Sequence, residues 1–416
     1  MGIKHLMQVI LENAPDAVVE NPVPSYFGRV IGIDASMALY QFLIAVRVEG
    51  QQLTNDKGEV TSHLMGMFTR TTKMMAAGLR PVYVFDGRPP EAKQNELARR
   101  HEVREDAKEK EAEAKEAGDQ AEMERFSRRQ VRVNQQHCDE AKRLLTLMGI
   151  PYIEAPGEAE AQCAALCRAG KIWATGSEDM DSLCFGSPIL LRNLTFSEAR
   201  KLPIREVHLD QVIAGLGLTM PQFVDFCILC GCDYCGTIKG IGEKNALKLI
   251  KRWGTIEQAL EHLDKTKFPL PESFNYQQAR ALFQQPEVLD PARVDLRWGQ
   301  PDEEGLVQFL VGEKQFAEDR VRATTARLRA SKQTATQSRL EQFMGPPAIM
   351  TSCSAPPGPW PMVQGPIVLT PSPFPPLRQQ AGAAAAEKGN KKARTSAKGA
   401  KGAAKATATK PAAKKR

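Results

Sequence analysis

Short apolar runs alternate with longer amphipathic segments along the first part of this 416-residue chain. Each apolar run is bounded by turn residues, as is typical of buried strands, and the amphipathic segments repeat their apolar positions at helical spacing. The pattern predicts strands at residues 29–34, 81–87, 150–153 and 171–175, and helices at about 36–47, 62–78 and 158–167. Strands that alternate with helices indicate an α/β fold around a mostly parallel central sheet flanked by helices.

A highly charged segment separates the second predicted strand from the third. Between Glu91 and Arg132, 23 of 42 residues are charged, with both signs mixed, and Gly118-Asp119 interrupts the run. Such a run is most often a solvated helical hairpin. The alternative is a mobile gate whose basic side chains face a polyanion, and the start of the run directly after Asp86 favours it. The basic side chains in question are Lys93, Arg99, Arg100 and Arg104.

The last part of the chain differs in composition from the rest. Residues 346–376 are rich in proline and residues 381–416 in Ala, Lys and Gly, so we expect a disordered tail. Residues 388–416 hold nine Lys and two Arg with no acid, which leaves the remainder of the chain net negative. The basic tail therefore indicates nonspecific polyanion affinity or a nuclear import signal, while DNA binding by the folded part would rest on local patches.

The overall composition excludes several classes of protein. A hydrophobic fraction of 42% and a charged fraction of 25% are ordinary for a globular protein. The sequence has no apolar run near the roughly 18 residues that span a bilayer and no signal peptide, so we expect an intracellular protein without a membrane partner. Four cysteines form two CxxC pairs separated by a single residue, which is too close for usual zinc modules: Cys227, Cys230, Cys232 and Cys235. We expect reduced thiols instead.

Acidic residues follow each of the four predicted strands. They are Asp34, Asp86, Glu158, Glu160, Asp179 and Asp181. A single strand-end acid most often caps the next helix or shapes a turn. Six of them converge, however, because the carboxyl ends of strands in an α/β sheet meet at one crevice. Carboxylates crowded together repel one another unless cations neutralise them, and oxygen ligands without His or Cys favour Mg²⁺, with Mn²⁺ as a substitute. Two ions about 3.5–4 Å apart would support hydrolysis of a phosphodiester.

A glycine-rich segment near residue 240 supplies a signal for the substrate. Gly240 and Gly242 open a predicted amphipathic helix at 246–253, which leaves backbone N–H groups free to meet a phosphate. Lys239 and Lys244 add attraction for phosphate without sequence information. The pattern indicates a helix-hairpin-helix clamp on a DNA backbone; an ordinary helix-start turn is the alternative. A dinucleotide site is disfavoured because no strand precedes the glycines.

Taken together, these segments resemble the structure-specific flap endonucleases of the XPG/5′-nuclease superfamily. The resemblance covers about residues 1–345 and rests on motifs at the family's order and spacing. The most specific are Ile33-Asp34-Ala35-Ser36-Met37, Val82-Tyr83-Val84-Phe85-Asp86-Gly87, Glu158-Ala159-Glu160-Ala161, Glu178-Asp179-Met180-Asp181 and Gly231-Cys232-Asp233-Tyr234. It implies a PIN-like 5′-nuclease fold with a helical arch and a helix-two-turn-helix.

The resemblance also implies a division of the chain. An N-terminal nuclease region would span 1–106, an arch linker 107–121 and an internal nuclease region with the helix-two-turn-helix 122–260. The core would end with 261–332, followed by a clamp-binding peptide at 336–344 and the tail from 346 to 416.

Roles for individual residues come from the same resemblance. Two Mg²⁺ ions would be held by two groups of acids, the first being Asp34, Asp86, Glu158 and Glu160 and the second Asp179, Asp181 and Asp233. Lys93 and Arg100 would place the scissile phosphate, and Asp181 is the acid whose loss should abolish cleavage. The implied DNA contacts are Gly2, Tyr40, Arg47, Arg70, Glu158, Gly231, Asp233, Lys239, Gly240, Gly242 and Lys244. For Tyr40, base stacking and a position at the edge of the core are equally compatible with the sequence. A K⁺ ion would bridge the helix-two-turn-helix to DNA.

The segment Gln337–Met344 resembles the peptide with which such enzymes bind the sliding clamp (PCNA). Gln337, Leu340 and Phe343 match its pattern, and Met344 replaces the final aromatic residue. Methionine fills an apolar pocket with less contact area, so we expect weaker binding. The implied protein is a monomer that docks on the trimeric clamp.

The expected activity is 5′ flap cleavage with a 5′–3′ exonuclease activity, in Okazaki fragment maturation and long-patch base excision repair. The branched DNA substrate and the basic tail imply a location in the nucleus, nucleolus included; a mitochondrial pool stays an open alternative. Three other classes also stay open: a Holliday-junction resolvase or longer-range exonuclease of the same superfamily, a catalytically silent scaffold, and a phosphatase.

Overall fold

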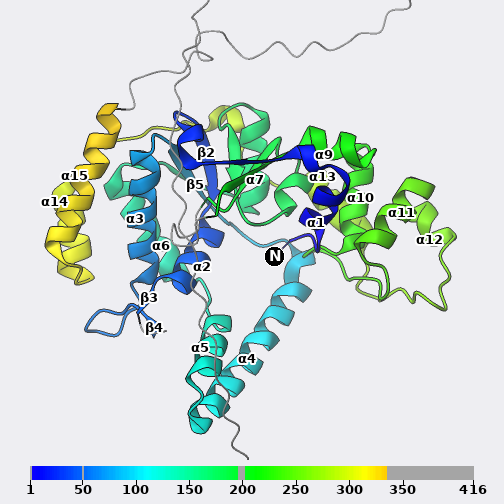
Figure 1. The fold of residues 1–416 in the computed structure, drawn as a ribbon, viewed down its shortest axis with the longest axis horizontal. Helices are drawn as coiled ribbons and strands as arrows, with labels where there is room; N and C mark the ends of the chain where they lie inside the picture. The colour runs from blue at the N-terminus through cyan, green and yellow to red at the C-terminus, as the bar shows by residue number, and fades with distance from the viewer. Residues whose placement is uncertain (1, 49–50, 195–201, 335–416) are drawn as a thin grey trace, which may run out of the picture. The chain divides into compact units, whose positions relative to one another are not determined.

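Figure 1 shows the computed structural model of the chain, which describes residues 2–48, 51–194 and 202–334. Its centre is a seven-stranded sheet with the order β1-β9-β8-β7-β2-β5-β6. The strands are β1 (Val18–Asn21), β2 (Val30–Asp34), β5 (Arg80–Phe85), β6 (Tyr152–Glu154), β7 (Ala174–Gly176), β8 (Ile189–Arg192) and β9 (Ile204–His208). The four predicted strands correspond to β2, β5, β6 and β7, all of which run parallel. The mostly parallel α/β sheet expected from the sequence is confirmed.

Part of the sheet was not predicted. β8 continues the parallel series beside β7, whereas β9 and β1 are antiparallel and close that edge. A separate pair, β3 (Arg47–Val48) and β4 (Gln51–Gln52), forms a small antiparallel ribbon. The strand β1, with the sequence Val-Val-Glu-Asn and two exposed residues in its middle, has neither a long apolar run nor an apolar alternation. Such edge strands give little signal in a single sequence.

Helices cover both faces of the sheet because its strands are apolar on both sides. Along β5, Tyr83 and Phe85 pack in one buried cluster with α2, α3, α6 and α15, whereas Val82 and Val84 pack in another with α7. This alternation follows the two-residue period of a strand. The bounds are α2 (Ala35–Ala45), α3 (Ser62–Ala76), α6 (Gln135–Met148), α7 (Ala159–Arg168), α14 (Glu303–Leu306), the π-helical segment Val307–Glu313, and α15 (Glu318–Thr334). The parallel strands therefore point their carboxyl ends toward one edge between these two layers.

A third buried cluster joins the N-terminus to the helices that follow the sheet. It contains Leu6 and Ile10 of α1 together with Phe223 and Phe226 of α10. The helices are α1 (Leu6–Asn13), α8 (Asp181–Cys184), α9 (Leu209–Leu216), α10 (Met220–Cys230), α11 (Glu243–Trp253), α12 (Ile256–Glu261) and α13 (Tyr276–Gln284). Helix α11 begins one turn earlier than predicted, with Gly242 as its N-cap.

The cysteine-rich segment belongs to this third cluster. Cys227 and Cys230 are buried within α10, and Cys232 and Cys235 are half-buried in the loop that follows it. Burial raises the pKa of all four thiols above the usual range, which disfavours the thiolate that a metal would require. The four cysteines of the two CxxC pairs are therefore packing residues of this cluster.

The charged segment forms a helical hairpin, as the sequence predicted. Its helices are α4 (Gln94–Ala117) and α5 (Gln120–Arg129), which contact each other and project away from the sheet in Figure 1. The turn between them has Gly118 in the left-handed conformation and Asp119 as the N-cap of α5, whose Oδ1 accepts from the N–H groups of Ala121 and Glu122. Only Ala107 and Ala114 are buried in α4, so the hairpin has almost no core of its own.

Among the described residues, no helix is by itself long and apolar enough to cross a membrane, and α9 with α10 reaches that length only as a pair bent by 83°.

A close contact between α2 and α3 makes one position of the fold intolerant of any side chain. A Cβ at Gly66 would lie 2.5 Å from both Cβ and Cγ of Phe42, which is itself buried. We predict that Gly66→Ala lowers the free energy of unfolding by about 1–3 kcal/mol, because overpacking outweighs the gain in helix propensity. Urea denaturation measures this. The control is Gly312→Ala, in a helical turn with open space around the new methyl group, and an equal effect of both changes would contradict the prediction.

Candidate active site

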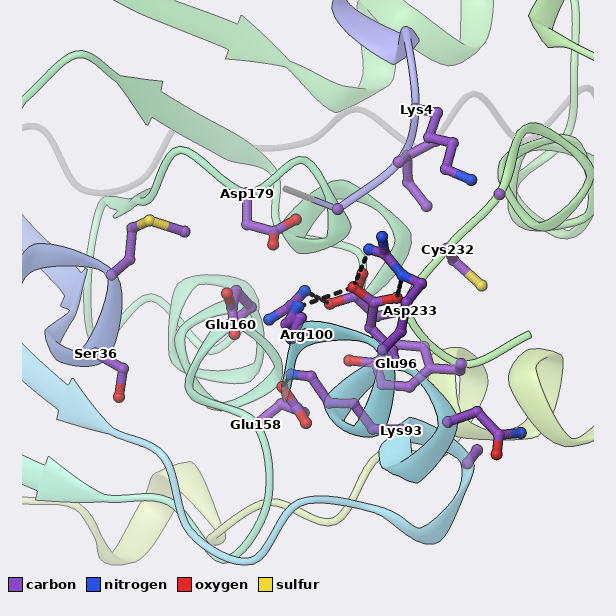
Figure 2. Close-up of a pocket in the computed structure, with 18 of the residues that line it drawn as sticks. Lys4, Ser36, Lys93, Glu96, Arg100, Glu158, Glu160, Asp179, Cys232 and Asp233 are labelled. Atoms are coloured by element: carbon purple, nitrogen blue, oxygen red, sulfur yellow. Dashed lines mark hydrogen bonds and ion pairs between the residues drawn. The ribbon is translucent and has the colours of Figure 1, made fainter. Parts of the chain in front are cut away.

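A cavity of about 1030 Å³ opens at the carboxyl edge of the parallel strands. Its wall is formed by strand-end acids, by the N-terminus, by the first turns of α4 and by the loop after α10, as Figure 2 shows. The predicted acids on the wall are Asp34, Asp86, Glu158, Glu160, Asp179 and Asp233, and Glu96 of α4 lines it as well. The crevice expected from the strand ends is therefore present, and Asp233, which only the family resemblance had placed there, lies in it as well.

Five of these acids, together with Asp181, which is not itself part of the wall, gather in two groups. Carboxylate oxygens of Asp86, Glu158 and Glu160 lie within 4.8 Å of one another, and so do those of Asp179, Asp181 and Asp233. The second group contains the same three acids that the resemblance assigned to one ion, and the first contains three of the four assigned to the other, without Asp34. Each group offers three hard oxygen donors to one cation, a set that suits Mg²⁺ or Mn²⁺.

Asp34 is both a helix cap and a neighbour of the acidic cluster, the two roles that the sequence had offered as alternatives. Its Oδ1 accepts from the N–H of Met37 at 2.9 Å and caps α2, while its Oδ2 accepts from Ser177 Oγ at 3.4 Å. Burial and the neighbouring charge of Asp86 raise the pKa of Asp34 to about 7. The carboxyl group thus lies at the end of β2 as a helix cap, close enough to the first group to be affected by its charge.

Burial and neighbouring charges raise the pKa of two other buried acids in the same way. Burial, followed by the charges of Asp34 and Asp86, raises the pKa of Glu160, and burial followed by Asp179 raises that of Asp181. Asp181 is only 3% exposed, and its Oδ1 finds no hydrogen-bond partner among the described residues. A buried carboxylate oxygen without a donor costs free energy unless a cation binds it. The chemistry of these side chains therefore fits divalent cations.

Two cations from the base of α4 meet the two acidic groups. Lys93 Nζ donates to Glu158 Oε2 at 2.5 Å in the first group, and Arg100 Nη2 donates to Asp233 Oδ2 at 2.5 Å in the second. Glu96 accepts from Arg100 Nε at 2.8 Å and holds the guanidinium in place (Figure 2). Burial alone would lower the pKa of Lys93, but the carboxylates around it outweigh burial and raise it. Both basic residues predicted to handle phosphate are therefore charged and inside the cavity.

The N-terminus approaches the second acidic group so closely that only glycine fits. A Cβ at Gly2 would lie 1.7 Å from Oδ1 of Asp179, and Gly2 has a φ of +75°. The backbone N–H of Lys4 donates to the carbonyl of Gly231 at 3.2 Å, which ties the N-terminus to the loop that carries Asp233. Gly231 itself has a φ of +109°, a conformation that favours glycine.

The remaining predicted residues lie at different distances from the cavity. Tyr40 is half-buried on its wall, whereas Arg47 is bonded to Ser127 of α5 at 3.2 Å and Arg70 lies on α3 outside the wall. The exposed residues at the start of α11 are also outside it: Lys239, Gly240, Gly242 and Lys244. Gln337, Leu340, Phe343 and Met344 fall outside the described residues.

Several cavity residues were missed from the sequence. Lys4 and Ser36 line the wall near the acids, and Arg129 and Arg132 line it at the base of the hairpin beside Arg104. From the sequence, only the basic residues at the start of the charged run could be predicted, because a mixed-charge pattern does not show that the end of the run also lies at the cavity. The two ends of the hairpin meet the same cavity, so its floor is acidic and its outer wall basic.

Comparison with known proteins identifies this arrangement. Residues 1–107 match the family model of the XPG N-terminal domain, and residues 149–233 match that of the XPG I-region. The chain resembles the solved flap endonuclease-1 from Methanococcus jannaschii with a TM-score of 0.60 and 32% identity, over 77% of this chain and 97% of that one. The catalytic core of Rad2 in complex with DNA substrate shares the fold, with a TM-score of 0.61 and 24% identity over 79% and 100% of the two chains. Fold and site thus define an XPG-type nuclease.

Sequence relatives narrow the class of nuclease to one family. Over 343 residues the chain is 57% identical to flap endonuclease 1 of Aedes aegypti and 56% identical to flap endonuclease 1 of Danio rerio. Each match covers 82% of this chain and 90% of the relative. The chain belongs to the flap endonuclease 1 family.

The crowded carboxylates predict an unusual dependence of stability on pH. The pKa of Asp34 is about 7 in the folded protein against 3.8 as its ordinary value. The folded state therefore binds a proton that the unfolded chain has already released, and this contribution to stability is lost as pH rises from about 4 through about 7. We therefore predict that, in the presence of a chelator, the melting temperature falls by several degrees between about pH 5.5 and about pH 7.5.

Calorimetry at constant ionic strength tests this prediction. Saturating Mg²⁺ should remove most of the pH dependence, and Asp34→Asn should reduce it without any added ion. Asp210→Asn, a change in an exposed acid of α9, serves as the control and should behave like the unaltered chain. A melting temperature in chelator that stays constant or rises across this interval would contradict the prediction.

Proposed function

We propose that this chain is a structure-specific 5′ flap endonuclease with 5′–3′ exonuclease activity, which hydrolyses phosphodiesters with two divalent cations. One observation carries the proposal: two groups of three carboxylates share a cavity with the cationic base of a helical hairpin. The acidic groups fit catalytic cations, and the basic wall fits the charge of a nucleic-acid strand. Identity of 57% to a protein named flap endonuclease 1 supports the flap as substrate.

Six acids would hold the cations, Mg²⁺ or its substitute Mn²⁺, in the two groups described above. Asp34 would contribute from the end of β2 as a neighbouring charge. When bound, the ions supply Lewis acidity that activates a water molecule and stabilises the leaving oxygen. The side chain of Asp181 is central here, because its buried Oδ1 has no other described partner.

Lys93 and Arg100 would exchange partners when substrate binds. In the structure each neutralises one acidic group. With cations held in those groups, Lys93 and Arg100 would be free to donate from one ammonium and one guanidinium to the scissile phosphate. Arginine suits this role because its planar fork matches two phosphate oxygens. The pair would therefore position the phosphate between the acidic floor and the hairpin.

The rest of the cavity would hold the two parts of a branched substrate. Arg104, Arg129 and Arg132 line the passage at the base of the hairpin and would contact the phosphates of the single-stranded flap. Tyr40 offers a ring on which a base can stack. Duplex DNA would extend to the exposed N–H groups at the start of α11, with a K⁺ ion bridging the backbone there.

The cellular setting follows from the same proposal. A flap nuclease with a Gln337–Met344 peptide would act behind a polymerase on a sliding clamp, in Okazaki fragment maturation and long-patch base excision repair. The basic residues from 388 onward would serve nuclear import. The protein would work as a monomer docked on the trimeric clamp.

Cleavage of a labelled double-flap DNA tests the activity. With Mg²⁺ we predict a product cut one nucleotide inside the duplex, on the order of a thousandfold less product with Asp181→Ala, and similar DNA affinity for both. Asp210→Ala is the control acid. Blunt duplex and a four-way junction serve as substrate controls. Equal cleavage by Asp181→Ala, or preferred cleavage of the four-way junction, would overturn the proposal.

The clamp peptide yields a separate prediction. Restoring the aromatic residue with Met344→Phe should tighten binding to the clamp about threefold to tenfold, because an aromatic ring adds buried area in the pocket. Phe343→Ala should weaken it by more. Calorimetry with purified clamp measures both, and flap cleavage without the clamp should be unchanged. If Met344→Phe binds the clamp no more tightly than the unaltered chain, the peptide does not use this pocket.

A further inference from the structure

Arg280 joins three helices outside the cavity through a set of charged hydrogen bonds. From α13 it reaches Asp225 on α10, with Nε 2.7 Å from Oδ1 and Nη2 2.8 Å from Oδ2. The same guanidinium reaches Glu257 on α12, with Nη1 2.7 Å from Oε1 and Nη2 3.0 Å from Oε2. Both contacts are two-pronged, the geometry in which Arg binds carboxylates most strongly. These three side chains are called the Arg280 junction below.

The junction also caps a helix. Oδ2 of Asp225 accepts from the backbone N–H of Ile256 at 3.1 Å, the first residue of α12. Glu257 stands in the first turn of the same helix, where a negative charge is favourable. Hydrogen bonding to Arg280 lowers the pKa of Glu257 to about 2, so that its charge persists at neutral pH. The orientation of α12 is thus set from α10 by side chains, in addition to the short connection from α11.

The two ends of this assembly belong to different parts of the proposed site. Helix α10 ends at Cys230, and the loop after it carries Asp233 of the second acidic group. Helix α11, directly before α12, begins at the exposed glycine turn that would bind the duplex backbone. Contacts join α10 to α11, α12 and α13. A change in the angle of α12 would therefore move the duplex contact relative to the acidic groups.

We propose that Arg280 is a positioning residue that sets where the DNA is cut, by fixing the distance between the α11 duplex contact and the acidic groups. This inference rests on the proposed flap cleavage. Among the described residues, Arg280 is not part of the cavity wall, and its charged hydrogen bonds go to Asp225 and Glu257, through which it would act. A duplex held at a fixed distance presents one phosphodiester to the acids; a duplex held loosely presents several.

The burial of the junction determines which variants are informative. The side chain of Asp225 is 5% exposed, whereas that of Arg280 is 23% and that of Glu257 is 41% exposed. Burial raises the pKa of Asp225 even beside Arg280. Removing Arg280 therefore leaves a buried acid without its cation, which costs stability. Glu257→Gln is the milder change, because it weakens the junction at its exposed end only.

The experiment compares two substrates that differ only in the length of one duplex arm, the arm that would extend from the cut to the start of α11. One duplex is about 5 base pairs, about half a helical turn, and the other is about 20 base pairs, close to two turns. On the long substrate we expect Arg280→Gln to raise KM by about tenfold and to spread cleavage over neighbouring phosphodiesters, with kcat within about threefold. Glu257→Gln should show the same pattern to a smaller degree. On the short substrate both variants should match the unaltered chain.

Two further variants separate positioning from a loss of stability. Arg280→Lys keeps the charge without the planar fork and should restore part of the single cut position. Arg293→Gln removes an exposed arginine that pairs with Asp290 and should change nothing. A fall in melting temperature without a change in cut position, or equal effects on short and long duplexes, would overturn the inference while leaving flap cleavage intact. Failure of the unaltered chain to cut flaps would overturn the proposed function and this inference with it.

Discussion

Mutual repulsion among buried carboxylates is the constraint on which the rest of this structure depends. Parallel strands deliver six acids to one edge of the sheet, and the loop after α10 adds a seventh. Burial and neighbouring charges raise the pKa of Asp34, Glu160 and Asp181, because their ionised forms are poorly solvated and repel one another. Such crowded acids must either keep protons or be neutralised by cations. Lys93 and Arg100 supply part of that compensation, and protons or bound metal would supply the remainder.

The same constraint explains why a helical hairpin with almost no core is attached at this point. Its first turns are held by ion pairs to both acidic groups, while its far end has few buried side chains. Cations in the acidic groups would release these pairs and leave Lys93 and Arg100 to the DNA. Under the proposed function, metal binding and the position of the hairpin would therefore be coupled through these shared carboxylates.

The sequence predicted those parts of the fold and site that depend on local pattern. Strands β2, β5, β6 and β7 have apolar runs, and acids of the cluster lie at the end of each strand or a few residues after it, so the cleft could be inferred from position alone. Strands β1 and β9 could not, because charged or polar residues interrupt the apolar residues in both. Asp233 follows a helix, so only the resemblance placed it. The Arg280 junction was missed because Asp225, Glu257 and Arg280 are far apart in sequence and each looks like an ordinary surface charge. Helix α11 was predicted one turn short because Glu243 to Asn245 are polar.

The central claim is that two separate groups of acids each hold one catalytic cation. Crystals of the protein with flap DNA and Mn²⁺, measured at the manganese absorption edge, test it directly. The account predicts two anomalous peaks, one contacted by Asp86, Glu158 and Glu160 and the other by Asp179, Asp181 and Asp233. A single peak, or peaks held by other residues, would contradict it.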